Sequence, residues 1–279
     1  MTAIFEAVIL MAGQGSRLRE SDKTFLKPFV PVLGRPLISY TLDALMRAGI
    51  KTVNFVVGYE SGRMIAQANR LIPSGLSVSF IENRDWQKQN GISLLAAAGH
   101  VGKSFLLTMS DHLFDQSIVD LLLHNAVPNQ LNLALDRKLD SIFDVDDAMK
   151  VQTQADRILK IGKDLTVYDG IDTGLFVCSL DIFDYLERVK RDGDCSLADG
   201  IRLMASEDKA RVVDIGDAWW QDIDTIAMLQ CAETQLRSRL ARHDIASANA
   251  GSGRGNRAGN QARARDNRPQ VQDPVSQAE

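Results

Sequence analysis

Short apolar runs alternate with stretches of helical spacing along the first part of the chain. Four runs rich in β-branched and aromatic residues predict strands, and they end near residues 10, 58, 83 and 111. Between them, apolar residues recur three and four positions apart, as on one face of a helix, at 39–49, 62–72 and 93–101. Because alternating strands and helices form βα units, this pattern predicts a largely parallel sheet covered on both faces.

The pattern changes after about residue 131. Three β-rich runs follow one another without an intervening helix, at 131–136, 148–154 and 157–163, and they predict an antiparallel stretch. Helices are expected from about residue 180 and from about residue 198. A last strand at 210–216 and a long final helix at 225–244 complete the predicted elements.

Length and composition suit one large α/β domain or two small ones. The chain has 279 residues, 45% of them apolar, which is enough for a single buried core. We expect a three-layer αβα domain with a mostly parallel, mixed sheet over residues 1–246. Residues 247–279 hold few apolar side chains, so they cannot offset the entropy cost of ordering. They predict a disordered, solvated tail. The alternative is that its five arginines, which stand among three acids, contact an anionic surface.

Charge, cysteines and hydropathy exclude several classes of protein. The net charge is −4 with mixed signs, unlike the basic surface of a nucleic-acid-binding protein. The three cysteines lie far apart, without the spacing of a zinc site. No segment has the pattern of a signal peptide or the roughly 18 apolar residues that span a bilayer. These features predict a cytoplasmic protein that holds any anion through a local cluster of cations.

The stretch "VILMAGQGSRLR", residues 8–19, places two glycines directly after the first strand. A dinucleotide fingerprint needs a third glycine where this chain has Leu18. A P-loop needs Gly-Lys-Ser/Thr after its first glycine, and neither glycine offers it. Backbone N–H groups around Gly13 and Gly15 are still open to phosphates, and Arg17 and Lys27 supply positive charge. The loop therefore predicts a triphosphate site of a third kind.

Carboxylates follow two later strands. "LLTMSDH" places Asp111 at the C-terminal end of a strand, where open α/β sheets bind ligands. "WWQDIDT" places Asp222 and Asp224 at a spacing of two, which in a strand puts both on one face. Helix capping is the alternative role for Asp111 and for Asp224. Together the two stretches suit Mg²⁺, which takes one or two carboxylates and otherwise phosphate oxygens and water.

The first strand, "MAGQGSRL" and the later "KPFVPVLGRPLI" resemble the signature of nucleotidyltransferases with the Rossmann-like, glycosyltransferase-A-like fold, which make NDP-sugars and CDP-alcohols. The resemblance implies that Arg17 and Lys27 are catalytic residues. It also implies Mg²⁺ as cofactor, held by Asp111 and Asp224 with Asp222 in reserve. The nucleotide site that it implies consists of Leu10, Ala12, Gly13, Gln14, Gly15, Ser16, Arg17, Lys27, Gly58, Glu82, Asn90, Gly91 and Ser93.

Five stretches resemble CTP:inositol-1-phosphate cytidylyltransferases: "QNGISLLAA", "FLLTMSDHLFD", "DDAMKVQ", "YDGIDTGLFVCS" and "WWQDIDT". The resemblance implies transfer of CMP from CTP to inositol 1-phosphate, giving CDP-inositol and pyrophosphate. It implies that Lys150 contacts the phosphate of the alcohol, and that Asp172 and Thr173 face its hydroxyl groups. From the residues alone, Lys150 as a solvated strand lysine and "IDTGL" as a turn between strands are the alternatives.

Some members of that family continue into a membrane-embedded CDP-alcohol phosphotransferase domain. Because this chain has the polar stretch 247–279 in that place, the resemblance implies that a separate membrane enzyme consumes its product.

Three alternatives to this function remain open. Phosphocholine cytidylyltransferases and sugar-1-phosphate nucleotidyltransferases share the loop, the lysine and the metal aspartates, and Trp86, Trp219 and Trp220 are candidates for a choline cage. A nucleotide-binding regulatory module without turnover is the alternative outside the enzymes, and a redox Rossmann protein is disfavoured by the missing glycine. His112 is expected to orient its neighbours, because an attacking phosphate is already an anion and needs no general base.

Overall fold

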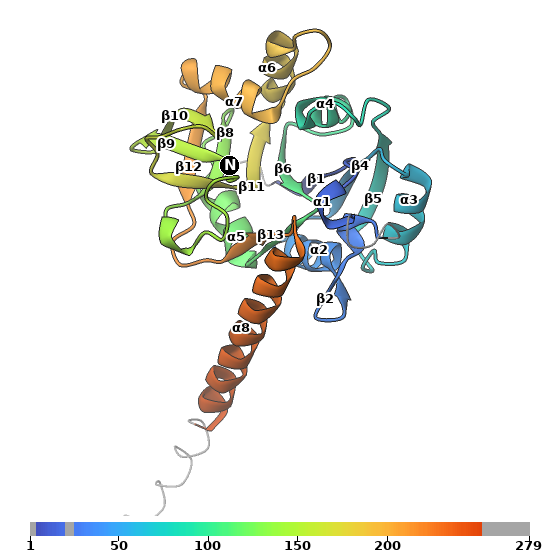
Figure 1. Cartoon of the computed structure of the whole chain (residues 1–279), viewed down its shortest axis with the longest axis vertical. Helices are drawn as coiled ribbons and strands as arrows, with labels where there is room; N and C mark the ends of the chain where they lie inside the picture. The colour runs from blue at the N-terminus through green and yellow to red at the C-terminus, as the bar shows by residue number, and fades with distance from the viewer. Residues whose placement is uncertain (1–3, 20–24, 253–279) are drawn as a thin grey trace, which may run out of the picture. The chain divides into compact units, whose positions relative to one another are not determined.

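The computed structural model describes residues 4–19 and 25–252. Contacts divide the chain into two compact units, Met1–Glu233 and Thr234–Glu279. The first unit contains all of the strands that the structure describes (Figure 1). The described part of the second unit is the C-terminal portion of helix α8, Ile226–Ser252. The candidate site lies entirely in the first unit.

A nine-stranded mixed sheet forms the centre of the first unit. Its spatial order is β5-β4-β1-β6-β11-β8-β12-β10-β9. The strands, in chain order, are β1 Glu6–Met11, β4 Thr52–Val57, β5 Ser77–Glu82, β6 Ser104–Met109, β8 Leu131–Asp136, β9 Lys150–Gln154, β10 Arg157–Gly162, β11 Gly170–Ser179 and β12 Ala210–Asp214. The first four in the chain pair in parallel, which confirms the βα units predicted from the sequence.

The predicted antiparallel stretch is confirmed only in part. β9 and β10 form an antiparallel pair, whereas β8 pairs in parallel with β12 and antiparallel with β11. All six residues of β8 are buried. A strand that is covered on both faces and flanked by partners from later in the chain has a pairing that local apolar spacing does not encode.

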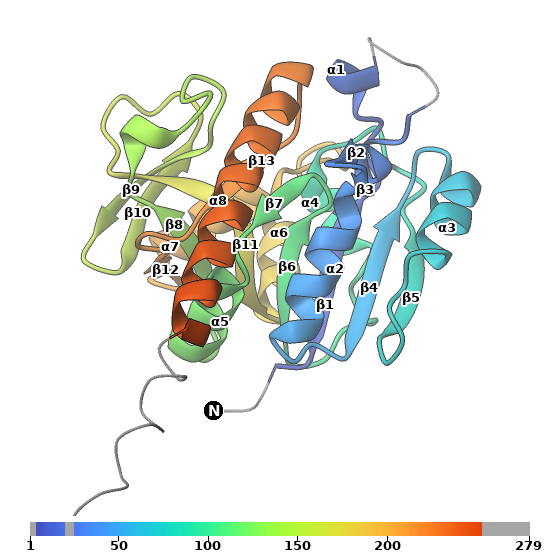
Figure 2. The same cartoon turned by 90° about the horizontal axis from the view of Figure 1, so that it is seen from below.

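Helices cover both faces of the sheet, which confirms the three layers (Figures 1 and 2). One buried cluster joins α2, α3 and α5 to the face that carries Ile9, and another joins α4, α6 and α7 to the face that carries Val8. Neighbouring side chains of β1 thus enter opposite layers, as the period of two requires. The bounds are α2 Leu37–Arg47, α3 Ser61–Asn69, α4 Asn90–Leu95, α5 Gln116–Asn125, α6 Asp181–Val189 and α7 Leu197–Ser206.

Short elements complete the first unit. They are α1 Ser16–Arg19, the 3₁₀ helices Lys27–Phe29 and Leu139–Ser141, and the paired strands β2 Pro31–Val32 with β3 Arg35–Pro36 and β7 His112–Phe114 with β13 Trp220–Asp222. α4 begins three residues before the helix expected at 93–101 and ends at Leu95. The side chain of Asn90 explains the early start, because its Oδ1 accepts a hydrogen bond from the Leu197 amide and ties this end to α7.

α8 is longer than the predicted final helix. It continues to Ser252, so the expected boundary between residues 246 and 247 falls inside it. Extending a helix costs far less than nucleating one, so the helix can continue past a boundary that was expected from composition alone. Residues 253–279, the rest of the expected tail, lie outside the described residues. Within the described chain, no helix has the length and apolar character needed to cross a membrane.

Two pairings bring the predicted site segments together. β1 and β6 lie side by side in register, with Leu10 opposite Met109, so the glycine loop and Asp111 emerge at the same edge of the sheet. β7 and β13 pair with His112 opposite Asp222, and the Ile223 amide donates to the Asp111 carbonyl over 2.9 Å. The stretch after Trp220 is thereby held beside Asp111.

Candidate active site

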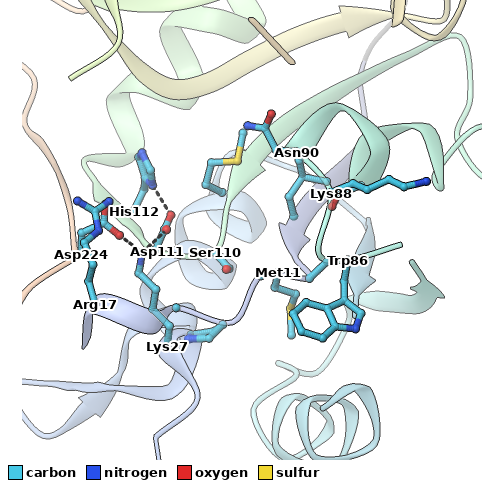
Figure 3. A pocket seen from close by; sticks show the side chains of 17 residues that line it. Met11, Arg17, Lys27, Trp86, Lys88, Asn90, Ser110, Asp111, His112 and Asp224 are labelled. Carbon is cyan, nitrogen blue, oxygen red and sulfur yellow. Dashed lines mark hydrogen bonds and ion pairs between the residues drawn. The ribbon is translucent and has the colours of Figure 1, made fainter. Parts of the chain in front are cut away.

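A pocket of about 410 Å³ opens at the carboxyl ends of β1 and β6 (Figure 3). Its volume lies within the usual range for small-molecule sites. Its walls come from the glycine loop, the ends of these strands, the start of α4 and the stretch after β13. The lining residues are Leu10, Met11, Ala12, Gly13, Gly15, Arg17, Lys27, Pro28, Trp86, Lys88, Asn90, Ser93, Met109, Ser110, Asp111, His112 and Asp224.

Lys27 is the centre of the charged group in this pocket. Its Nζ contacts Asp111 Oδ2 at 2.5 Å and forms a second ion pair with Asp224, and only 11% of its side chain is exposed. Burial alone would lower the pKa of Lys27, but the two carboxylates outweigh it and raise this pKa. Lys27 therefore carries a full positive charge between two negative ones.

Gly15 makes room for Lys27. A Cβ at this position would lie 2.8 Å from the Lys27 Cβ, and the backbone has φ of +64°, which side chains rarely adopt. The second glycine of the loop is therefore required by the lysine that follows twelve residues later.

Arg17 forms the other cationic contact of the site. Its Nη2 lies 2.6 Å from Asp224 Oδ2, and its Nη1 lies 2.8 Å from Asp147 Oδ2. The hydrogen bond to Asp147 is the largest cause that raises the pKa of Arg17. Asp147 in turn pairs with Lys163. Sequence reasoning missed Asp147, and its only signal was a place in the "DDAMKVQ" stretch, because no local pattern distinguishes it from neighbouring acidic residues.

Asp111 is held from two sides (Figure 3). Its Oδ1 lies 2.6 Å from His112 Nδ1, while its Oδ2 faces Lys27. Burial would raise the pKa of Asp111, but Lys27 and His112 hold it well below its usual range. The carboxylate is therefore ionised throughout the physiological range.

Of the two later aspartates, Asp224 reaches the pocket. Its carboxylate bridges Lys27 and Arg17. Asp222 does not line the pocket, and its Oδ1 accepts a hydrogen bond from Gln221 Nε2 at 3.0 Å. Burial is the main cause that raises the pKa of Asp222. The geometry favours Asp224 over Asp222 as the partner of Asp111.

The acidic groups suit a metal ion that also takes ligands from the substrate. Among the residues that the structure describes, no group of three or more His, Cys, Asp or Glu side chains is arranged to hold a metal ion. A Mg²⁺ site nevertheless usually needs only one or two carboxylates from the protein, because phosphate oxygens and water complete the coordination.

Residues of α4 and of the preceding loop form the opposite wall. Asn90 and Ser93 line the pocket, and the Ser93 hydroxyl accepts a hydrogen bond from the side-chain Nδ2 of Asn83 at 3.0 Å. Trp86 and Lys88 also line it, and the Trp86 ring packs edge-on against Tyr59 with centroids 5.1 Å apart. No sequence pattern singles out Lys88, Met109 or Ser110 as residues of this pocket, and Trp86 is expected from the sequence only as part of a choline cage.

Among the described side chains, several expected nucleotide residues do not line the pocket. A Cβ at Gly58 would lie 2.4 Å from the Trp86 Cβ, and one at Gly91 would lie 2.5 Å from the Cys195 carbonyl, so both glycines permit close contacts between segments. The Glu82 carboxylate accepts from the Ser61 hydroxyl at 3.4 Å. Gln14 is exposed, and the side chain of Ser16 lies outside the described residues.

The three expected substrate residues are engaged inside the protein. Lys150 is buried, and its Nζ donates to the carbonyls of Lys163 and Asp146 at 2.7 and 3.3 Å. Thr173 is buried and donates to the Ala134 carbonyl at 2.8 Å. Asp172 Oδ1 accepts from the Gly174 amide at 2.7 Å, and burial raises the pKa of Asp172 to about 6. None of the three lines the pocket beside Lys27.

The chain is similar to known proteins over most of its length. Residues 7–141 match the model of the MobA-like NTP transferase domain. Two relatives named bifunctional IPC transferase and DIPP synthase, from Aquifex aeolicus and Rubrobacter xylanophilus, are 31% and 32% identical over 82% of this chain and 51% of their own length. The chain thus spans about half the length of the curated relatives that it matches.

Solved structures show the same fold. The inositol-1-phosphate CTP transferase from T. maritima superposes with a TM-score of 0.72 at 28% identity, covering 81% of this chain and 91% of that one. A UDP-glucose pyrophosphorylase complexed with UDP-glucose also gives a TM-score of 0.72, at 16% identity and over 85% and 99% of the two chains, and shows the fold alone. Residues 7–141 therefore form a MobA-like NTP transferase domain, and over most of its length the chain is similar to proteins named as IPC transferases and as an inositol-1-phosphate CTP transferase.

Proposed function

We propose that this protein transfers CMP from CTP to inositol 1-phosphate, giving CDP-inositol and pyrophosphate. The observation that carries the proposal is the convergence of Asp111 and Asp224 on Lys27. Lys27 and Asp224 are 197 residues apart in the chain. A cation between two carboxylates, directly beside a glycine loop, provides both signs of charge that a phosphoryl site requires.

The reaction is an in-line displacement at the α-phosphorus of the nucleotide. A phosphate oxygen of the alcohol phosphate forms the new P–O bond as the bond to the pyrophosphate oxygen breaks. The attacking oxygen is already an anion, so no proton has to move. Repulsion between two polyanions and the charge on the leaving pyrophosphate limit the rate. Positioning and electrostatic stabilisation by Arg17, Lys27 and the loop amides supply most of the acceleration.

Mg²⁺ is part of this proposal. Asp111 and Asp224 would hold it, because their carboxylates lie close together in the pocket and leave the remaining ligand positions to the substrate. When bound, the ion supplies positive charge that neutralises the phosphate oxygens. In the ion's absence, Lys27 balances the two carboxylates itself.

CTP and inositol 1-phosphate are supported by three lines of reasoning. The five stretches quoted above resemble the cytidylyltransferases of this substrate. The relatives carry the name IPC transferase, and a structural neighbour is an inositol-1-phosphate CTP transferase. A choline cage is disfavoured, because Trp86 is the only one of Trp86, Trp219 and Trp220 among the pocket-lining residues of the described chain.

The test is pyrophosphate release from each of four NTPs, crossed with inositol 1-phosphate, phosphocholine and glucose 1-phosphate, with and without Mg²⁺. We expect release with CTP and inositol 1-phosphate in the presence of Mg²⁺. Turnover with a different pair would replace the substrate assignment and leave the reaction class intact. Tight nucleotide binding without release from any pair would favour a regulatory module.

A further inference from the structure

A chain of contacts runs from the end of β8 to the Asp111 carboxylate. It starts at Asp136, which is 2% exposed. Its Oδ2 accepts a hydrogen bond from Trp220 Nε1 at 2.9 Å, and its Oδ1 accepts from both the backbone amide and the Nζ of Lys138 at 2.8 Å. A buried carboxylate is costly unless it is paired, and here both oxygens are paired. Asp136 is therefore a fixed anchor for the Trp220 ring.

The Trp220 ring in turn fixes the ring of His112. The two rings are stacked, with centroids 5.8 Å apart and planes 13° from parallel. A third residue, Gly174, limits the His112 ring at its far nitrogen, because a Cβ on Gly174 would lie 2.6 Å from His112 Nε2. Gly174 has φ of +73°, and its amide donates to Asp172 Oδ1. The "IDTGL" stretch thus supports His112 in this structure.

His112 fixes the orientation of the Asp111 carboxylate from one side. An ionised carboxylate only accepts hydrogen bonds, so the Nδ1 of His112 carries the proton and donates to Asp111 Oδ1 over 2.6 Å. The other oxygen, Oδ2, is left to face Lys27. Without the His112 contact, only the ion pair with Lys27 would orient the Asp111 carboxylate, whose terminal torsion has a broad rotamer preference.

We propose that Asp136 and Trp220 are positioning residues, which hold His112 so that Asp111 presents Oδ2 to the nucleotide and its metal ion. This inference rests on the proposed nucleotidyltransferase function. Neither residue lines the pocket, so both act through His112. Small misplacements of reacting groups are costly, with about 10²-fold in rate for 1 Å.

A double-mutant cycle tests the proposal. Asp136→Asn should lower kcat about tenfold, a fraction of the loss for a 1 Å misplacement, with little change in the KM for CTP. His112→Phe keeps a ring on Trp220 but removes the hydrogen bond to Asp111. In the His112→Phe background, Asp136→Asn should cause no further loss, because residues that act in series are not additive. Trp220→Phe keeps a ring on His112 but loses the Nε1 donor, and should resemble Asp136→Asn.

A second measurement does not depend on turnover. In the ¹⁵N-labelled, nucleotide-free protein, the Nδ1 proton of His112 should give a slowly exchanging imidazole resonance, assigned by its absence in His112→Phe. Asp136→Asn and Trp220→Phe should broaden or abolish it. The matched control is Asp120→Asn, which removes an exposed carboxylate on α5 and should leave both the resonance and kcat unchanged.

The outcomes separate the two proposals. If wild-type protein turns over none of the substrate pairs, the proposed function fails, and the imidazole resonance still decides on the positioning chain. If the losses from Asp136→Asn and His112→Phe multiply, or if the resonance persists unchanged in Asp136→Asn, the positioning role is wrong. If Asp136→Asn does not fold, Trp220→Phe takes its place in both measurements, with the same expected outcomes.

Discussion

Lys27 shows how one residue combines structural and chemical roles. It separates two carboxylates that would otherwise repel each other, and it is nearly buried. The charge of a residue in such a position interacts more strongly with other charges than it would in water, because the local dielectric constant is low. In the proposed reaction, the same charge stabilises the α-phosphate of the nucleotide.

Lys27→Ala should therefore lower kcat by about 10² to 10³, the scale for losing one oriented charge at a transition state. The measurement is steady-state pyrophosphate release, with circular dichroism to confirm that the variant is folded. Lys103→Ala removes an exposed lysine and serves as the control. Near-normal turnover of folded Lys27→Ala would contradict the role.

Asp172 gives the fold a defined pH dependence. Burial raises the pKa of Asp172 from 3.8 to about 6, so the folded chain holds this proton more tightly than the unfolded chain. The stabilisation is complete below pH 3.8 and is lost as the pH rises through 6. Asp172→Asn removes the charge and keeps the acceptor for the Gly174 amide. Its free energy of unfolding should exceed that of wild type at pH 8 by up to about 3 kcal/mol.

Chemical denaturation of both proteins at pH 4, 6 and 8 checks this expectation. The difference between them should grow as the pH rises. Asp164→Asn, at an exposed aspartate, tests for a general effect of removing one negative charge. A difference between Asp172→Asn and wild type that is the same at all three pH values would show that burial does not perturb Asp172.

At the scale of elements, helix ends fix the wall of the pocket. α7 begins with a capping box in which the Ser196 hydroxyl accepts from the Asp199 amide, and the Asp199 carboxylate accepts from the Ser196 amide. The next amide, of Leu197, donates to Asn90 Oδ1, and Asn90 lines the pocket. The cap of one helix therefore supports the start of α4.

Ser196→Ala should lower the free energy of unfolding by about 1 kcal/mol, the usual cost of losing such a cap. Because α7 holds Asn90, the KM for the nucleotide should also rise. Denaturant unfolding and steady-state kinetics measure the two effects. Ser206→Ala, at an exposed position at the end of α7, should change neither. A stability equal to wild type would mean that the box does not contribute.

At the scale of the whole molecule, the site exists only when two distant parts of the chain meet. The pairing of β7 with β13 carries Asp224 to Asp111. A ligand that binds both parts stabilises the folded state by mass action, by about 2.7 kcal/mol at 100 times its Kd. Binding of the nucleotide and the metal ion should therefore raise the stability of the fold as well as permit catalysis.

Removing the metal should abolish turnover, and adding Mg²⁺ after EDTA treatment should restore it. CTP with Mg²⁺ should raise the unfolding temperature more than CTP with EDTA, because the ion reduces repulsion between the triphosphate and the two carboxylates. Differential scanning calorimetry measures the shift. Asp224→Asn should reduce the difference between the two conditions. An equal shift with and without the ion would indicate that the nucleotide binds independently of the metal.

The amino-acid sequence by itself determined the local features of this protein. Apolar spacing located the βα units, and the loop of Gly13 and Gly15 with its two cations marked one wall of the candidate pocket, because strand period and glycine conformation are local properties. The tertiary structure alone decided the pairing of β8 with β12, the entry of Asp224 rather than Asp222 into the pocket, the contact of Asp147 with Arg17, and the burial of Lys150. These features join residues far apart in the chain, and which distant groups meet depends on how all of the elements pack together.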